Sequence, residues 1–158
     1  ETETALLITT AFMALGSVTL SALSMAFQRS HSRKSVRPFC NVFNDSTDSE
    51  ISVSIQNAGL GPMLIQKVVL LKNQDDPIEK GIQLAEFFSE GNCDVLIQNT
   101  NAYVLASLFK IKLFRCTAGI NDHSSMPLLR NKLNGCTLYV KYADVYDDMY
   151  EKKETLIF

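Results

Sequence analysis

The sequence predicts one N-terminal transmembrane α-helix followed by an all-β antiparallel sandwich of seven or eight strands. Two observations carry this prediction. Residues 4–28 contain no charged side chain, whereas the rest of the 158-residue chain mixes short apolar runs with polar turns. Several of those runs alternate apolar and polar residues, which is the period of a strand with one buried face. Such strands pack as two sheets, and a small closed barrel is the alternative.

The apolar run of residues 5–27 is long enough to span a membrane. At about 1.5 Å per residue it measures roughly 34 Å, against a hydrocarbon core of about 30 Å. A cleaved signal peptide would begin with basic residues and have a shorter apolar core. This sequence begins with the acidic stretch ETET. We therefore predict a membrane helix over residues 5–28.

The helix is followed by a segment that is basic and contains no acid. Its charged residues are Arg29, Arg33, Lys34 and Arg37. Because positive charges remain on the cytoplasmic side, they predict a bacterial inner-membrane protein with its N-terminus outside. Residues 29–37 are predicted as a basic juxtamembrane linker, which Pro38 ends because proline disfavours helix in the residue before it. Residues 38–158 are then the cytoplasmic domain.

The remaining elements follow from alternation and from turn residues. Strands are predicted over residues 38–43, 51–57, 63–72 and 93–99, one or two more over 103–116, and two over 136–158. Short helices are predicted near residues 84–88 and 128–135. Residues 58–62 form a Gly-Pro turn, and Asp147 and Asp148 form an acidic turn between the last two strands.

Two motifs resemble those of a known group of proteins. They are IxVxIxNxGxGPMxI over residues 51–65 and YVKYADVYDDMY over residues 139–150. Together with the segment order, they resemble uncharacterised bacterial single-pass membrane proteins. The resemblance implies an immunoglobulin-like (Ig-like) cytoplasmic sandwich and, for some relatives, a role as anti-phage defence effectors. The motifs are structural, so the resemblance implies no chemistry.

The predicted helix carries a stripe of small residues at separations of 4, 3, 4 and 3. They are Thr10, Ala14, Ser17, Ser21 and Ser24, and Glu3 continues the series at the outer end. This period keeps one seam of a helix towards a partner. The hydroxyls could simply bond to their own helix, or the stripe could allow close helix packing. A third interpretation is a pore of four or more chains, with a ring of Glu3 at its mouth.

The leading functional hypothesis is a homo-oligomeric membrane effector, in which the helices form a pore or channel controlled by a ligand- or partner-sensing sandwich. The resemblance implies a role for it in anti-phage defence. The alternative is a membrane-anchored protein-interaction module without conductance. Its partners would be the lipid bilayer and a companion protein that binds a strand edge.

A ligand site is suggested by Lys110 and Lys112, which share one strand face, and by Arg115, which joins them only if a bulge intervenes. A nucleotide or oligonucleotide could bind there, with Phe114 or Tyr103 stacking on a base. The plainer interpretation is a set of solvated lysines that protect a sheet edge.

Residues that carry chemistry are few. The two histidines, His31 and His123, form no metal-ligand or triad pattern, and no phosphate-binding loop is present. Four carboxylates cluster late in the chain, at Asp144, Asp147, Asp148 and Glu151, and are interpreted as a solvated hairpin turn rather than a cation site. We predict that the protein is not an enzyme and has no catalytic residue, metal or cofactor.

The sequence contains four cysteines: Cys40, Cys93, Cys116 and Cys136. They are widely spaced and include no CxxC pair. In a reducing cytoplasm they are predicted to be buried thiols, whereas the opposite membrane orientation would allow two disulfides.

Overall fold

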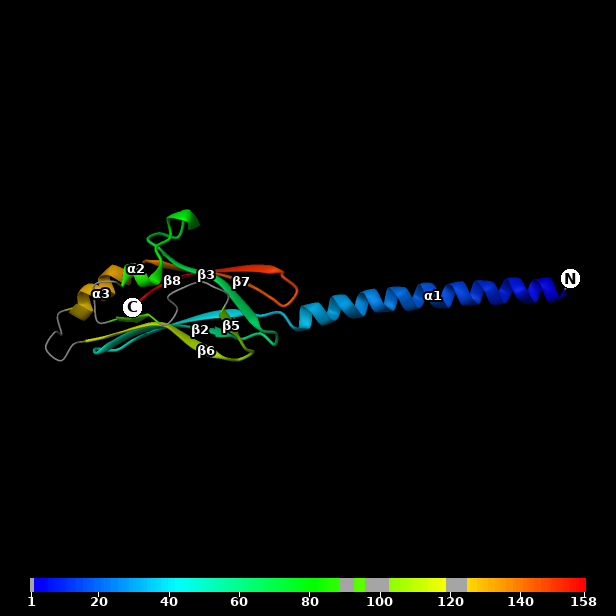
Figure 1. Cartoon of the computed structure of the whole chain (residues 1–158), viewed down its shortest axis with the longest axis horizontal. Helices are drawn as coiled ribbons and strands as arrows, with labels where there is room; N and C mark the ends of the chain where they lie inside the picture. Colours follow the sequence, from blue (N-terminus) through cyan, green and yellow to red (C-terminus); the bar gives the residue numbers. More distant parts are fainter. Residues whose placement is uncertain (1, 89–92, 96–102, 119–124) are drawn as a thin grey trace. The chain divides into compact units, whose positions relative to one another are not determined.

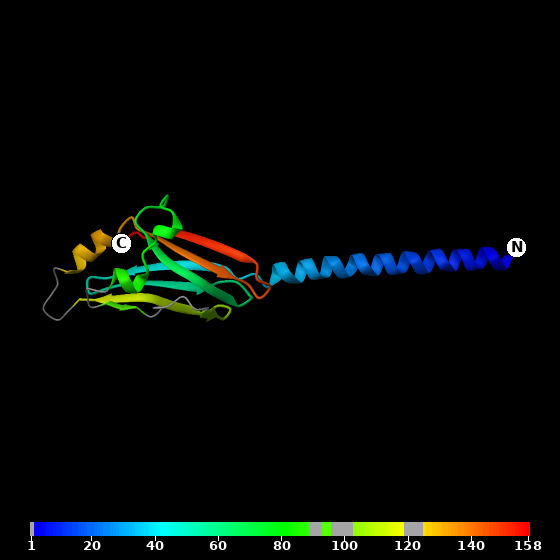
Figure 2. The same ribbon diagram turned by 45° about the horizontal axis from the view of Figure 1, so that its top comes forward.

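The structure is a computed structural model that describes residues 2–88, 93–95, 103–118 and 125–158 (Figure 1). The chain divides into two compact units, Glu1–Val36 and Arg37–Phe158. The first is a single helix, and the second is a sandwich of two β-sheets (Figure 2).

Helix α1 covers Thr2–Ser35 and buries none of its residues. Among the described residues it is the one helix long and apolar enough to cross a membrane. It continues through Arg29, Arg33 and Lys34, so most of the predicted linker is helical. Nothing in that segment breaks a helix until Pro38, and the helix ends three residues before it.

The sandwich contains eight antiparallel strands in two four-stranded sheets. One sheet has the order β1-β2-β6-β4, with bounds Cys40–Ser46, Glu50–Asn57, Lys110–Thr117 and Cys93–Val95. The other has the order β5-β3-β7-β8, with bounds Tyr103–Leu105, Met63–Leu71, Thr137–Ala143 and Met149–Thr155. The two separate sheets confirm the predicted sandwich, and the alternative of a small closed barrel is not observed. The orders β1-β2-β6-β4 and β3-β7-β8 match the ABED and CFG sheets of Ig constant domains.

In the described part of the second unit there are also three short helical segments: η1 Ile78–Lys80, α2 Leu84–Phe87 and α3 Ser125–Leu133. Helix α2 lies where Leu84 and Phe87 predicted it. Helix α3 begins earlier than the predicted segment of residues 128–135. It is followed by Gly135 at φ 84°, the left-handed conformation that glycine adopts most easily after a helix.

The core fills the space between the two sheets. Ile51, Val53 and Ile55 of β2 are fully buried, as their alternation predicts. Ser52 and Ser54, on the opposite face of β2, are also buried. They are covered because β2 lies inside its sheet, where Ser52 is flanked by Asp45 and Arg115 across the ladder. Strand β2 is therefore buried on both faces and not on one.

An irregularity in the ladder sets the faces of β6. Phe114 pairs with Val53, but Lys112 pairs with Ser54, so Leu113 is the additional residue of a β-bulge. A bulge shifts the side-chain alternation by one position. Arg115 therefore lies on the same outer face as Lys112.

The two ends of the sandwich carry different loops. We call the end at which β1 begins the proximal end, and the opposite end the distal end. The loops β2–β3, β5–β6 and β7–β8 all turn at the proximal end, while the β1–β2 turn and α3 lie at the distal end (Figures 1 and 2).

Buried Asn57 ties the proximal loops together. Its side-chain amide donates to the carbonyl oxygens of Gly61 at 2.7 Å and Leu105 at 3.2 Å. Its Oδ1 accepts from the backbone amides of Phe39 and Gly59 at 3.2 and 3.0 Å. An added Cβ at Gly59 would overlap the backbone of residues 37–39, so only glycine permits this approach.

Candidate functional site

Three of the four hydroxyls of the α1 stripe donate hydrogen bonds within their own helix. Thr10 Oγ1 donates to the Leu6 carbonyl at 2.5 Å, and Ser17 Oγ donates to Ala14 at 2.8 Å. Ser21 Oγ donates to the carbonyl of Ser17 at 2.8 Å. These are the i−3 and i−4 bonds expected of serine and threonine inside a helix. Each donor is satisfied within one chain, although each oxygen can still accept from a neighbouring helix.

These bonds do not single out the stripe. Thr9 and Thr19 lie off the stripe and make the same kind of bond, to Ala5 at 2.7 Å and to Gly16 at 2.8 Å. What distinguishes the stripe is the small size of its residues. Glu3 lies in the first turn of α1, on the same helical row.

The predicted basic residues divide between the two units. Arg33 and Lys34 lie in the last turn of α1, about one turn beyond Arg29. Arg37 belongs to the sandwich, where its guanidinium lies 5.2 Å from the centre of the Tyr150 ring. This cation–π contact holds the chain against β8 just before β1 begins.

The three predicted ligand-binding cations are brought to one face of the sheet, but each is paired with a carboxylate. Lys112 Nζ and the Arg115 guanidinium contact the two oxygens of Glu50 at 3.1 and 2.9 Å. Lys110 Nζ lies 3.9 Å from Asp45 Oδ2 and 4.4 Å from the centre of the Phe43 ring. Asp94 of β4 pairs with Arg115 across the ladder, so the face carries three cations and three carboxylates and has no excess positive charge for a phosphate.

Glu50 is the electrostatic centre of this face. Hydrogen bonds from Lys112 and then Arg115 lower the pKa of its carboxyl group below its ordinary value. The ionised carboxylate is therefore held between two cations. The geometry is that of a surface ion-pair network joining β2 to β6.

The predicted stacking partners do not complete a ligand site. Phe114 is fully buried in the core, so its assignment as a stacking residue is wrong. The bulge at Leu113 shifts the alternation of side chains along β6, and this shift places Phe114 on the inner face of the sheet. Tyr103 is exposed but lies on β5 of the other sheet.

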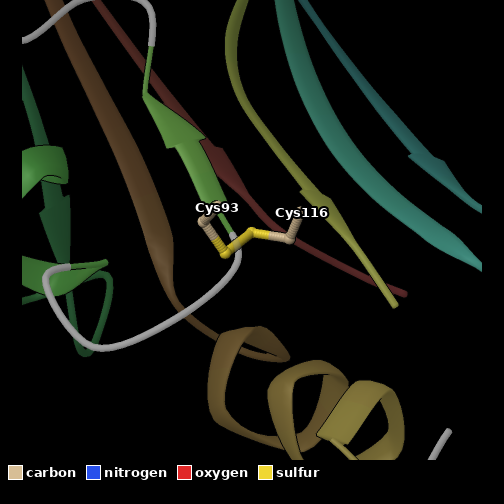
Figure 3. The surroundings of a disulfide bond; sticks show 2 residues. All are labelled: Cys93 and Cys116. Atoms are coloured by element: carbon tan, nitrogen blue, oxygen red, sulfur yellow. A yellow bond between two sulfur atoms is a disulfide. The ribbon is translucent and has the colours of Figure 1, made fainter. Parts of the chain in front are cut away.

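Two cysteines form a disulfide, which corrects the prediction of four thiols. Cys93 of β4 and Cys116 of β6 pair directly across the ladder, with their Cα atoms 4.1 Å apart (Figure 3). The bond joins two strands of one sheet, whereas the Ig disulfide joins the two sheets. Sequence spacing alone could not reveal this pairing, because 22 residues separate the two cysteines along the chain.

Cys40 and Cys136 are buried thiols, as predicted. Burial raises the pKa of the Cys40 thiol to about 12. Burial also raises the pKa of Cys136. Because the thiolate is the reactive form, both groups are protected from oxidants and alkylating reagents.

Asp144 organises the turn between β7 and β8. Its Oδ1 accepts the backbone amides of Tyr146 and Asp148 at 2.8 and 3.0 Å, and its Oδ2 accepts the Tyr150 hydroxyl at 3.3 Å. The carboxylate is almost completely buried. Its oxygens are thus used within the turn, as the interpretation of a hairpin turn requires.

Within the described ranges, no group of three or more His, Cys, Asp or Glu residues could hold a metal ion. His31 lies in exposed α1, remote in sequence from the carboxylates. His123 lies outside the described residues.

The sequence interpretation missed the apolar character of the proximal loops. Leu60, Leu108, Phe109, Val145 and Tyr146 are all exposed at turn positions. Turns ordinarily carry Gly, Pro, Asn, Asp and Ser. The signal was present in the sequence as apolar residues between strands, but it becomes a surface only when three separate loops meet at one end.

Comparisons with known proteins give no assignment. No protein-family model matches the chain, and no curated protein matches it.

Proposed function

We propose that the chain is a single-pass membrane protein that displays the sandwich as a protein-interaction module. One observation carries this proposal: every large apolar side chain of α1 is exposed, while the sandwich builds its core without any residue of α1. Those exposed residues are Leu6, Leu7, Ile8, Phe12, Met13, Leu15, Val18, Leu20, Leu23, Met25 and Phe27. Burying each would gain about 1.5–3 kcal/mol, and a bilayer offers that burial.

Substitutions in the middle of α1 test the anchor. Arginine at a helix centre costs about 2.5–3.5 kcal/mol on insertion, so Leu15→Arg with Val18→Arg should release the chain from membranes. The measurement is the share of full-length protein that stays with membranes after an alkaline wash. Leu128→Arg, on exposed α3, is the matched control. Equal retention of all three proteins would reject the anchor.

The orientation of the sandwich is proposed from charge. The basic residues of 29–37 support a cytoplasmic sandwich in a bacterial inner membrane. The Cys93–Cys116 disulfide favours an oxidising compartment, on the other side. Rapid alkylation of intact cells, followed by a count of the free thiols of the protein, distinguishes these two orientations of the sandwich. Cytoplasmic protein should carry four thiols, whereas two thiols would place the sandwich outside.

The binding surface we propose is the edge of β1. Strands β1 and β8 are both seven-residue edge strands. Strand β8 carries four charged residues, which discourage pairing, whereas β1 carries only Asp45. An extended segment of a companion protein could therefore add to the sheet beside β1.

Site-specific cross-linking tests this edge. A photo-reactive amino acid would replace Asn41 in β1 or Lys153 in β8 of the full chain, in its native membrane. We expect a discrete cross-linked protein from position 41 and none from position 153. Equal yields from both positions, or none from either, would reject β1 as the binding edge.

The second candidate is a homo-oligomeric pore, which the heptad-spaced stripe favours. Four or more α1 helices packed on Thr10, Ala14, Ser17, Ser21 and Ser24 would line a channel with hydroxyls. Opened by a ligand or partner of the sandwich, such a channel could serve as the membrane-disrupting effector of an anti-phage system. The internal hydrogen bonds of the hydroxyls make the plain anchor the first proposal.

Particle mass and conductance test the pore. A monomer in native lipid would reject it, whereas a defined tetramer or larger assembly would support it. Ser17→Leu with Ser21→Leu should then abolish ion flux across a planar bilayer while membrane insertion is kept. Unchanged flux in that variant would reject the stripe as the pore lining.

A further inference from the structure

The proximal end of the sandwich ends in a cap of exposed apolar side chains. We define the proximal tip as Phe39, Leu60, Leu108, Phe109, Val145 and Tyr146. Their exposed fractions run from 42% for Tyr146 to 70% for Leu60. They come from the chain before β1 and from three different loops, so no single turn accounts for them.

The distal end shows that this composition is not general to the loops of the domain. The β1–β2 turn there consists of Thr47, Asp48 and Ser49, and the loop after β3 contains Asn73, Gln74, Asp75 and Asp76. Among the turns that the structure describes, these two are thus polar and carry acidic residues, as solvent-exposed turns usually do. The exposed apolar residues of the described loops gather at the end where β1 begins.

The connection between the two units is short. Four residues, 36–39, separate Ser35 at the end of α1 from Cys40 at the start of β1. Five residue-to-residue steps lead from Ser35 to Cys40, and at about 3.3–3.6 Å per step they cover roughly 18 Å when fully extended. Residues 28–35 continue α1 for about 12 Å beyond the apolar run. If α1 spans a membrane, the proximal end therefore lies within about 30 Å of the surface at which α1 emerges, and it can reach that surface.

We propose that the proximal tip rests in the interfacial layer of the membrane that α1 spans, with lipid as its partner. The aromatic rings of Phe39, Phe109 and Tyr146 suit the headgroup level, where amphipathic and aromatic side chains collect. The inference depends on the proposed membrane anchor. It goes further, because a tether alone does not require the sandwich to touch lipid.

Charge near the tip is mixed. Arg37 lies beside Tyr150 at this end, and the basic residues of 29–34 precede it. Asp147 and Asp148 follow Tyr146 in the same turn. The apolar residues, and not attraction to anionic lipid, therefore supply most of the contact. Contact should persist in zwitterionic vesicles.

The absence of tryptophan from the sequence gives a direct test. Single substitutions Phe109→Trp and Tyr146→Trp would place a fluorophore in the tip of the full chain, reconstituted in phosphatidylcholine vesicles. Ile157→Trp, near the exposed C-terminus, is the distal control, and Phe12→Trp in α1 reports on the anchor. Nitroxide-headgroup lipids and lipids brominated along the acyl chain would be the quenchers.

We expect the two tip fluorophores to lose emission with headgroup quenchers and to shift their emission to the blue, while position 157 is unchanged. Position 12 should respond to the acyl-chain quenchers. Loss of emission at position 12 with none at 109 and 146 would overturn the lipid contact and leave the anchor intact. No quenching at position 12 would overturn the anchor itself.

A protein occupant gives a different pattern. If a second copy of the chain covered the tip, positions 109 and 146 would shift to the blue without lipid quenching. That shift would disappear as the protein is diluted in the vesicles. This pattern would overturn contact of the proximal tip with lipid.

Discussion

Helix α1 and the sandwich place the same kinds of side chain in opposite surroundings. Phe12 in α1 is 71% exposed, whereas Phe114 in β6 is completely buried. The sandwich buries its core side chains within residues 37–158, whereas α1 buries none of its residues within the chain. The contrast teaches that one unit folds by its own packing, while the other depends on surroundings that the chain does not supply.

The largest expected loss of stability is that of Phe114→Ala, for which Phe12→Ala is the matched control. Phe114→Ala should lower the free energy of unfolding of the sandwich by about 3–5 kcal/mol, through lost burial and the cavity left behind. Phe12→Ala should leave it unchanged. Denaturant unfolding of the full chain in detergent measures both. A matching loss from Phe12→Ala would break the comparison by showing that α1 supports the sandwich.

The second effect is that of the disulfide. Reducing Cys93–Cys116 should lower the stability of the sandwich by about 3 kcal/mol, because the bond closes a loop of moderate length in the unfolded chain. The helicity of α1 should not change. Circular dichroism and denaturant unfolding with and without reductant measure the two. Coincident loss of helix and sheet signals would contradict the independence of the units.

A third, smaller effect concerns the β7–β8 turn. Asp144→Ala removes three hydrogen bonds of a buried carboxylate and should cost about 1–3 kcal/mol, because it leaves partly buried donors without their acceptor. Asp148→Ala, in the same turn but exposed, should change stability by no more than about 0.5 kcal/mol. Thermal unfolding of both variants measures the difference. Equal effects would mean that the turn does not depend on the Asp144 carboxylate.

The smallest effect is the pH dependence of Glu50. Because the pKa of Glu50 is lower in the folded state, its contribution is present above the unfolded pKa of about 4.3. It is lost as the pH falls through the folded pKa. Glu50→Gln should flatten the acid side of the stability profile slightly, and added salt should do the same to the native protein. Asp48→Asn, in the neighbouring turn, is the control. If Glu50→Gln left the dependence of stability on pH unaltered, the ion pairs of Glu50 would not contribute to the stability of the sandwich.

The local pattern of the sequence predicted most of the fold. The apolar length of residues 5–27 predicted α1, and the alternation of Ile51, Val53 and Ile55 predicted β2 and its inner face. The acidic turn at Asp147 and Asp148 correctly separated the last two strands. These features succeed because each depends on neighbours within one turn or one strand.

The features that the sequence could not predict depend on partners distant in the chain. The bulge at Leu113 exists only in the ladder between β6 and β2, and it decides the face of Arg115. The pairing of Cys93 with Cys116 requires β4 to lie beside β6. Glu50 neutralises Lys112 and Arg115 across more than sixty residues of sequence, which turned a predicted ligand site into an ion-pair network.

The ladder register also sets the order in which the protein can be made. Val53 pairs with Phe114 and Val68 pairs with Val140, so each sheet must wait for strands from the later part of the chain. The bonds of α1 are all local, and it is synthesised first. Roughly 5–20 s of translation separates the two, at about 5–20 residues per second. The sandwich therefore closes by slow non-local pairing after α1 has had time to form. A stalled or truncated chain would present a formed helix with unpaired strands.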